Sequence, residues 1–214
     1  MKRKIIVALS IILVSGPSNG NFNESFLENI DDVIHMEFSD GSLYRGQVEE
    51  CLIGLDMTSC MHGKGIYTFK AGSKYVGNFI KNKPNGLGLF RYEDGQSYEG
   101  EFQDGFIEGY GVMTYPNGIK YEGDYKKNKR EGFGIMTFKD AGIYQQNSRY
   151  EGWWKNDRAN GAGFFSYVNG LTYTGNFDNV IMSGHGIMFY PDVSRYECLF
   201  INKQRNGYAF ATYM

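Results

Sequence analysis

The chain contains 214 residues and has a formal net charge of −2, because 22 lysines and arginines face 24 aspartates and glutamates. This near balance gives no electrostatic attraction to nucleic acid, so we expect no nucleic-acid partner. There are 29 glycines, and 16% of the residues are aromatic. Glycine is thus used at about twice its usual frequency, and so many aromatic rings exclude a disordered chain.

Residues 1–20 have the composition of a targeting segment. Lys2-Arg3-Lys4 precede the apolar run Ile5–Val14, and small residues follow at Ser15–Ser18. This order matches a secretory signal peptide, and the run is too short to span a bilayer. It predicts a protein of the secretory pathway or the extracellular space. If the segment is retained as an apolar strand or anchor, the alternative location is the cytoplasm, the cytoskeleton or a membrane surface.

Residues 21–34 carry the pattern of a short amphipathic helix. Ser25 and Glu28 have the spacing of a capping box, and apolar residues recur on one face. These apolar residues are Phe22, Phe26, Ile30, Val33 and Ile34. Met36–Gly41 then resembles the second half of a repeat whose first half is missing. We therefore predict a capping helix plus half repeat over residues 21–43, with the helix covering the first edge of a sheet.

The clearest unit of the sequence is Tyr98–Lys120, which reads YEGEFQDGFIEGYGVMTYPNGIK. Aromatic residues and glycines alternate near its start and again after the polar stretch in its middle. Period-two alternation on both sides of a polar loop predicts a β-hairpin. Asn117-Gly118 closes the unit with residues that tolerate positive φ, so that the chain reverses again. We expect aromatic rings to lie over glycines of the neighbouring strand, where missing side chains leave room.

The same unit recurs along the chain. Its leading tyrosines are 23 residues apart, except for two longer intervals of 31 and 29 residues. They are Tyr44, Tyr75, Tyr98, Tyr121, Tyr150, Tyr173 and Tyr196. A fixed period of this length signals a solenoid-type array. We therefore predict an all-β fold, an elongated single-layer antiparallel sheet of tandem 23-residue β-hairpins.

The three cysteines do not form a disulfide framework. Cys51 and Cys60 lie in the inserted residues of the first repeat, so they form a possible disulfide if the chain is exported. Cys198 stands where the last repeat should have a glycine, and we expect it to be a small buried residue.

The repeated pattern Tyr-x-Gly-x-aromatic, followed by Gly-x-Gly-x-x-x-aromatic-x-x-Gly, resembles the MORN (membrane occupation and recognition nexus) repeat. The resemblance covers about residues 36–214 and implies seven MORN-like repeats over residues 44–214. Proteins with such arrays serve as assembly platforms in ciliary, cytoskeletal and membrane-contact structures, which implies a scaffold here. Some MORN-like arrays are fused to catalytic domains, but here the repeats leave no space for one.

No motif in the sequence points to catalysis. The Gly-x-Gly steps lack the six-residue fingerprint of nucleotide-binding loops. The cysteines and histidines do not have the spacing of zinc ligands. We therefore expect no enzymatic activity, no catalytic residues, no cofactor and no metal.

The predicted sheet has more apolar surface than a single layer can bury. Large apolar patches on soluble proteins mark interaction sites, and aromatic residues anchor interfaces well. We therefore predict a non-catalytic scaffold or adaptor that binds a partner protein, or a second copy of itself as a homodimer, along an aromatic face. The expected contact residues are Phe79, Tyr92, Phe102, Tyr115, Tyr125, Phe138, Trp154 and Tyr167.

Basic side chains gather in the predicted hairpin loops on one side of the array. They suggest an alternative function, a peripheral membrane module that binds anionic phospholipids. The expected lipid-binding residues are Lys81, Lys83, Lys126, Lys127, Lys129 and Arg130. Lysines at sheet edges also prevent aggregation, and this structural interpretation of the same residues stays open.

Overall fold

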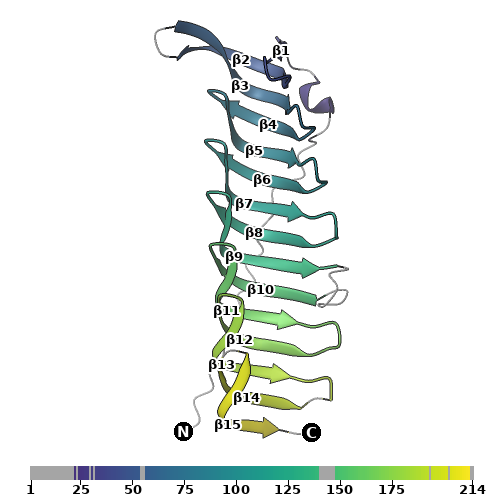
Figure 1. Cartoon of the computed structure of the whole chain (residues 1–214), viewed down its shortest axis with the longest axis vertical. Helices are drawn as coiled ribbons and strands as arrows, with labels where there is room; N and C mark the ends of the chain where they lie inside the picture. The colour runs from purple at the N-terminus through teal and green to yellow at the C-terminus, as the bar shows by residue number, and fades with distance from the viewer. Residues whose placement is uncertain are drawn as a thin grey trace.

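The fold is a single open sheet (Figure 1). The computed structural model describes residues 22, 24–28, 30, 32–53, 56–139, 148–192, 194–201 and 203–212. Within them, fifteen antiparallel strands pair in the order of the sequence, each with the strands before and after it. The strands are β1 (Ile34–Glu37), β2 (Leu43–Ile53), β3 (Asp56–Thr68), β4 (Lys74–Ile80), β5 (Lys83–Arg91), β6 (Ser97–Gln103), β7 (Phe106–Thr114), β8 (Lys120–Lys126), β9 (Lys129–Phe138), β10 (Ser148–Lys155), β11 (Arg158–Ser166), β12 (Thr172–Asp178), β13 (Ile181–Phe189), β14 (Arg195–Ile201) and β15 (Gln204–Thr212).

The predicted all-β, single-layer antiparallel sheet is confirmed. Strand β1 corresponds to the expected half repeat, and β2–β15 form seven successive hairpins. The predicted signal peptide at residues 1–20 lies outside the described residues, and so do residues 140–147, which fall in the 29-residue interval between Tyr121 and Tyr150.

Where the structure describes the connections, two kinds of turn join the strands, one kind on each edge of the sheet. Within hairpins, two-residue turns place both central residues at positive φ, as at Lys127 (φ 48°) and Asn128 (φ 67°). Between hairpins, five-residue loops close with bonds such as Tyr115 N–H to Ile119 O at 2.9 Å. In that loop only Gly118 has positive φ (78°), while Asn117 Oδ1 accepts from Ile119 N–H at 3.2 Å. The Asn-Gly pair therefore belongs to the wider loop, and the tight turns use other residues.

The turn between β12 and β13 contains a residue unsuited to its backbone. Val180 has φ 66°, a conformation that is unfavourable for β-branched side chains. Asn82 and Asn128 occupy the equivalent position in other hairpins. Since the Val180 side chain is 56% exposed, we expect Val180→Asn to raise the free energy of unfolding by about 1 kcal/mol. Urea denaturation measures the change.

The control is Val168→Asn. Val168 is also exposed in a loop, but its φ is not positive, so this substitution should leave the denaturation midpoint unchanged. Equal shifts for both variants would rule out relief of backbone strain as the cause.

One line of glycines crosses the sheet from strand to strand. Each glycine in the line pairs with the glycine of the next strand until Gly186 pairs with Cys198. The line consists of Gly46, Gly65, Gly77, Gly88, Gly100, Gly111, Gly123, Gly134, Gly152, Gly163, Gly175 and Gly186. Cys198 is 3% exposed, which confirms that it is a small buried residue at a glycine position.

The leading tyrosine of the repeat lies over these glycines, as expected. Tyr75 is fully buried, and its hydroxyl donates a 3.0 Å hydrogen bond to the backbone carbonyl of Asn78. A Cβ added to Gly88 would lie 2.5 Å from the Tyr75 hydroxyl oxygen. The side chain missing at the glycine is therefore what makes room for the ring.

The rings form a continuous stack, which we call the buried ladder. Tyr98 contacts Phe102 of its own hairpin and Tyr125 of the next, both edge to face with centroids 5.2 Å apart. Each ring is at most 6% exposed. The buried ladder consists of Tyr44, Phe79, Tyr75, Phe102, Tyr98, Tyr125, Tyr121, Trp154, Tyr150, Phe177, Tyr173 and Phe200. The rings of neighbouring repeats thus bury one another, so this face of the sheet is covered without a second layer of secondary structure.

The capping helix predicted over residues 21–34 is wrong. The residues described between 21 and 34 form a 3₁₀ turn, η1 (Glu24–Leu27), and Ile34 instead begins β1 and pairs with Gly46. So short a segment is a marginal helix in water, and its last residue, Ile34, pairs in a strand instead. Four of the predicted apolar residues are still partly buried, because they pack against a cluster of Leu27, Ile66 and Val76 on the face opposite the buried ladder. They are Phe22, Phe26, Ile30 and Val33.

The buried tyrosines make the fold sensitive to alkali. Burial raises the pKa of Tyr173 to about 12 and also raises the pKa of Tyr75, Tyr98 and Tyr121. In an unfolded chain the pKa is about 10. The protonated rings therefore stabilise the fold fully below about pH 10, and this contribution is lost as the pH rises through the folded pKa.

We expect a constant denaturation midpoint at neutral pH and a falling one between about pH 10 and pH 12. The ultraviolet absorbance of tyrosinate, followed with circular dichroism, checks this. The buried rings should ionise only as the sheet unfolds. Ionisation of every tyrosine near the ordinary pKa with the sheet intact would contradict it.

Candidate protein-binding surface

The eight predicted contact residues divide into two groups in the structure. Phe79, Phe102, Tyr125 and Trp154 belong to the buried ladder and are 2%, 5%, 6% and 6% exposed. The expectation that these four rings face an open surface is wrong, because edge-to-face contacts with the neighbouring repeats cover them. We therefore place them in the core of the sheet.

The other four predicted residues lie together on one edge. Tyr92, Tyr115 and Tyr167 each begin a five-residue loop, and Phe138 ends β9 at the equivalent position. All four side chains are half-buried. With the residues at the same position in other repeats they form one set, which we call the edge row. The edge row consists of Phe38, Phe69, Tyr92, Tyr115, Phe138, Tyr167 and Tyr190.

All edge-row residues except Phe138 share one backbone arrangement, because their loops repeat the same hydrogen bond. The N–H of Phe69 donates to the Ser73 carbonyl, and that of Tyr92 donates to the Gln96 carbonyl, both at 2.9 Å. Each of these six loops therefore holds its first residue in the same way at the end of a strand. The 23-residue period of the sequence thus becomes a regular series of aromatic side chains in space.

Aromatic rings on the strands pack against the rings of the edge row. Tyr92 packs against Phe90 with centroids 4.4 Å apart, and Phe165 packs against Tyr167 at 4.5 Å. Phe69 lies 5.6 Å from Phe90 and is 39% exposed. The rings of the edge row are therefore held in place on one side and reach solvent on the other, as expected of interface anchors.

The loops beside the edge row are more acidic than basic. Their described charged residues are Asp40, Lys70, Glu93, Asp94, Lys139 and Asp192. Backbone and hydroxyl hydrogen bonds from Ser42 lower the pKa of Asp40. Burial raises the pKa of Tyr92, and the nearby Tyr115 and Asp94 raise it further. The middle of the row thus combines neutral rings with negative charge.

The predicted lipid-binding residues lie on the opposite edge, at the tight turns. Five of them are exposed: Lys81, Lys83, Lys126, Lys127 and Lys129. Arg130 is different, with a side chain that is only 18% exposed. Its guanidinium lies 4.5 Å from the ring centroid of Trp154 and donates to Asp157 O at 2.8 Å. The expectation that Arg130 faces a lipid surface is therefore corrected, because it packs on the buried ladder.

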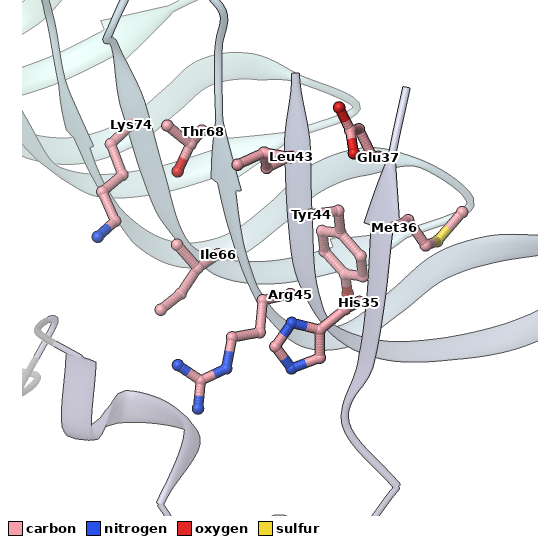
Figure 2. A pocket seen from close by; sticks show the side chains of 9 residues that line it. All are labelled: His35, Met36, Glu37, Leu43, Tyr44, Arg45, Ile66, Thr68 and Lys74. Atoms are coloured by element: carbon pink, nitrogen blue, oxygen red, sulfur yellow. The ribbon is translucent and has the colours of Figure 1, made fainter. Parts of the chain in front are cut away.

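A pocket of about 440 Å³ lies near the first strands, and the sequence pattern did not predict it. His35, Arg45, Ile66 and Lys74 are among its lining residues, and they come from β1, β2, β3 and β4. Figure 2 shows the side chains of His35 and Arg45 on the same side of the sheet, where the pairing of β1 with β2 places the two residues opposite each other. The pocket is open and mixes basic side chains with Glu37 and apolar residues. These residues come together only through strand pairing, so no local sequence motif predicts the pocket.

The remaining candidate features are few. Cys51 and Cys60 form a disulfide in the long β2–β3 hairpin, with Cα atoms 5.9 Å apart. The residues that the structure describes contain no group of three or more potential metal-ligating side chains. Across that same part of the chain, no helix has the length and apolar character needed to cross a bilayer.

A row of hairpins in one open sheet, each contacting only its neighbours, defines a β-hairpin solenoid with a repetitive aromatic surface. The profile of the MORN repeat matches residues 61–74, 75–97, 98–120, 121–142, 150–172 and 173–192. The chain therefore belongs to the MORN repeat proteins, which confirms the resemblance seen in the sequence. No curated protein matches it.

Solved structures with a comparable strand arrangement are distant. The TCP domain of SAS-4 (dCPAP) from Drosophila melanogaster, solved with a proline-rich motif of Ana2, is 13% identical, with 80% of this chain and 86% of that chain covered and a TM-score of 0.46. The G-box domain of the microcephaly protein CPAP is 13% identical, with 86% and 99% covered and a TM-score of 0.46. The TCP10 domain of Danio rerio CPAP, solved with a STIL peptide, is 14% identical, with 78% and 84% covered and a TM-score of 0.40. These likenesses carry no functional inference for this chain.

Proposed function

We propose that this MORN repeat protein is a non-catalytic scaffold that binds a partner protein through the edge row. The observation that carries the proposal is a series of half-buried or exposed rings, one per repeat, on one edge of the sheet. Because strand residues such as Phe90 hold these rings, a partner can bury them at little cost in side-chain entropy. A second copy of the chain is the alternative partner.

The test removes three rings from the edge row. The variant Tyr92→Ala, Tyr115→Ala and Tyr167→Ala should lose its crosslinked partner or its dimer while keeping the circular dichroism of the sheet. A matched control replaces Phe133 and Trp153 by alanine, because both are exposed on the opposite face. Loss of binding in the control alone, or unchanged binding in the ring variant, would overturn the proposal.

A second candidate function is binding to anionic membranes through the tight-turn edge. The supporting observation is that Lys81, Lys83, Lys126, Lys127 and Lys129 are exposed on that edge. Each contributes roughly 1 kcal/mol near an anionic surface. Sedimentation with phosphatidylserine vesicles should therefore decrease as salt rises. It should also decrease when the three lysines between 126 and 129 become serine, and unchanged sedimentation would exclude this function.

We also propose that the chain enters the secretory pathway. Residues 1–20 have a signal-peptide pattern, and disulfides such as Cys51–Cys60 persist in oxidising compartments. The N-terminus of the mature protein tests this location. A start near Pro17 or Asn21 supports it, whereas an intact Met1 favours the cytoplasm.

A further inference from the structure

We propose that the edge row binds a proline-rich segment in the polyproline II conformation, with lysine or arginine placed toward its Tyr92–Tyr115 section. This inference deepens the proposed scaffold function and rests on it, because it specifies the chemistry of the partner that the same rings would bind.

The spacing of the rings is the first reason. Phe69, Tyr92 and Tyr115 follow β3, β5 and β7 and stand at equivalent positions in their loops. Successive rings are therefore two strands apart, which corresponds to about 9.6 Å across a sheet. A polyproline II helix presents the same face every three residues, or about every 9.3 Å. Over these three rings the mismatch stays below about 1 Å.

The other regular conformations fit this spacing poorly. An α-helix presents the same face after two turns, or about 10.8 Å, so its side chains move steadily out of step with the rings. An extended strand presents the same face about every 6.8 Å, and at three residues its side chain points to the opposite side. Of the three conformations, only polyproline II presents the same face of the partner to each successive ring.

The chemistry of the surface is the second reason. Aromatic-lined grooves bind proline-rich segments, which pay little ordering entropy because the polyproline II helix is already formed. In the edge row, Phe90 packs against both Phe69 and Tyr92, while Phe69 is exposed and Tyr92 is only half-buried. The rings are therefore both fixed and accessible, as stacking on proline requires.

The third reason is charge, which differs along the edge row and so favours one orientation of the bound segment. The loops 92–96 and 115–119 contain Glu93 and Asp94 and no lysine or arginine. Both acids are exposed, and the Asp94 carboxylate is held by Gln96, whose N–H donates to Oδ1 at 3.0 Å. In the preceding loop the charge reverses, because Lys70 follows Phe69. A basic residue of the partner is therefore favoured at the Tyr92–Tyr115 section and disfavoured at Phe69.

The experiment measures the binding of labelled peptides to the full chain by fluorescence anisotropy. The probe has proline at every third position and lysine near one end. A second peptide of the same composition has proline at every fourth position, and a third has glutamate in place of lysine. We expect the period-three basic peptide to bind at least tenfold more tightly than the other two.

Variants of the protein locate the binding surface. Tyr92→Ala and Tyr115→Ala should each lower the affinity for the probe about tenfold. Phe133→Ala, on the face of the sheet opposite the buried ladder, should leave the affinity unchanged. Glu93→Gln with Asp94→Asn should weaken binding severalfold and remove its salt dependence. The amide at position 94 keeps an oxygen for Gln96, so the loop is retained.

Three results would overturn the inference: equal binding of the period-three and period-four peptides, no binding of the probe, or binding that is indifferent to the edge-row substitutions. If the probe does not bind while the triple ring variant still loses its partner, the scaffold function is supported and the polyproline II partner is excluded. If the probe fails and the triple variant keeps its partner, both proposals fall. Loss of a dimer alone would assign the edge row to a second copy of the chain.

Discussion

Gly111→Ala should destabilise the sheet by about 3 kcal/mol, the upper end of the usual penalty for overpacking. The added Cβ would fall on the ring of Tyr98. That ring cannot move aside, because Phe102 and Tyr125 contact it edge to face at 5.2 Å and its hydroxyl is bonded to Glu101 O at 3.1 Å. Urea denaturation measures the global loss, and hydrogen exchange of β6–β8 measures the local one.

Gly72→Ala is the matched control for this prediction. Gly72 has φ 100° and nothing within 4 Å of an added Cβ, so its substitution reports backbone conformation alone and should cost about 1 kcal/mol. Gly111 is not at positive φ, so its penalty is steric. A smaller loss at Gly111 than at Gly72 would show that the rings over the glycine line are free to shift.

The two adjacent tryptophans should respond very differently to removal. Trp154→Ala should cost about 3–5 kcal/mol, as expected for a buried aromatic residue, because Trp154 is 6% exposed. Its indole N–H donates to Gly134 O at 3.2 Å, and the Arg130 guanidinium lies over its ring. Trp153 points to the opposite face and is 52% exposed, so Trp153→Ala should cost less than about 1 kcal/mol.

Fluorescence offers a second measurement, because the chain has only these two tryptophans. Without Trp153, the remaining Trp154 should emit at short wavelength and resist quenching by iodide. Without Trp154, the remaining Trp153 should emit at longer wavelength and be quenched. Equal stability loss and equal quenching in the two variants would contradict the placement of Trp154 in the buried ladder.

Much of the fold was predictable from the sequence because its pattern is local. Alternation with period two within Tyr98–Lys120 places Tyr98, Gly100 and Phe102 on one face of a strand, whatever lies beside it. The 23-residue period then requires each hairpin to resemble the next. For the same reason the contact of tyrosine rings with glycines was predictable.

The sequence was less informative about which rings are buried. Phe102 and Tyr115 are both aromatic and lie on the same face of the predicted hairpin. Only the structure shows that Phe102 is enclosed by Tyr75 and Tyr98 while Tyr115 begins a loop at the edge. Burial depends on side chains contributed by neighbouring repeats, and a residue's own strand does not reveal them.

The class of fold, the repeat and the position of the aromatic residues follow from periodicities of the chain, so the amino-acid sequence alone was enough to predict them. Three features required the stacked hairpins: Arg130 packs on Trp154, a strand begins at Ile34, and only some of the aromatic side chains reach solvent. The reason is that these outcomes depend on free-energy differences between competing contacts across strands, and such contacts exist only once the hairpins are stacked.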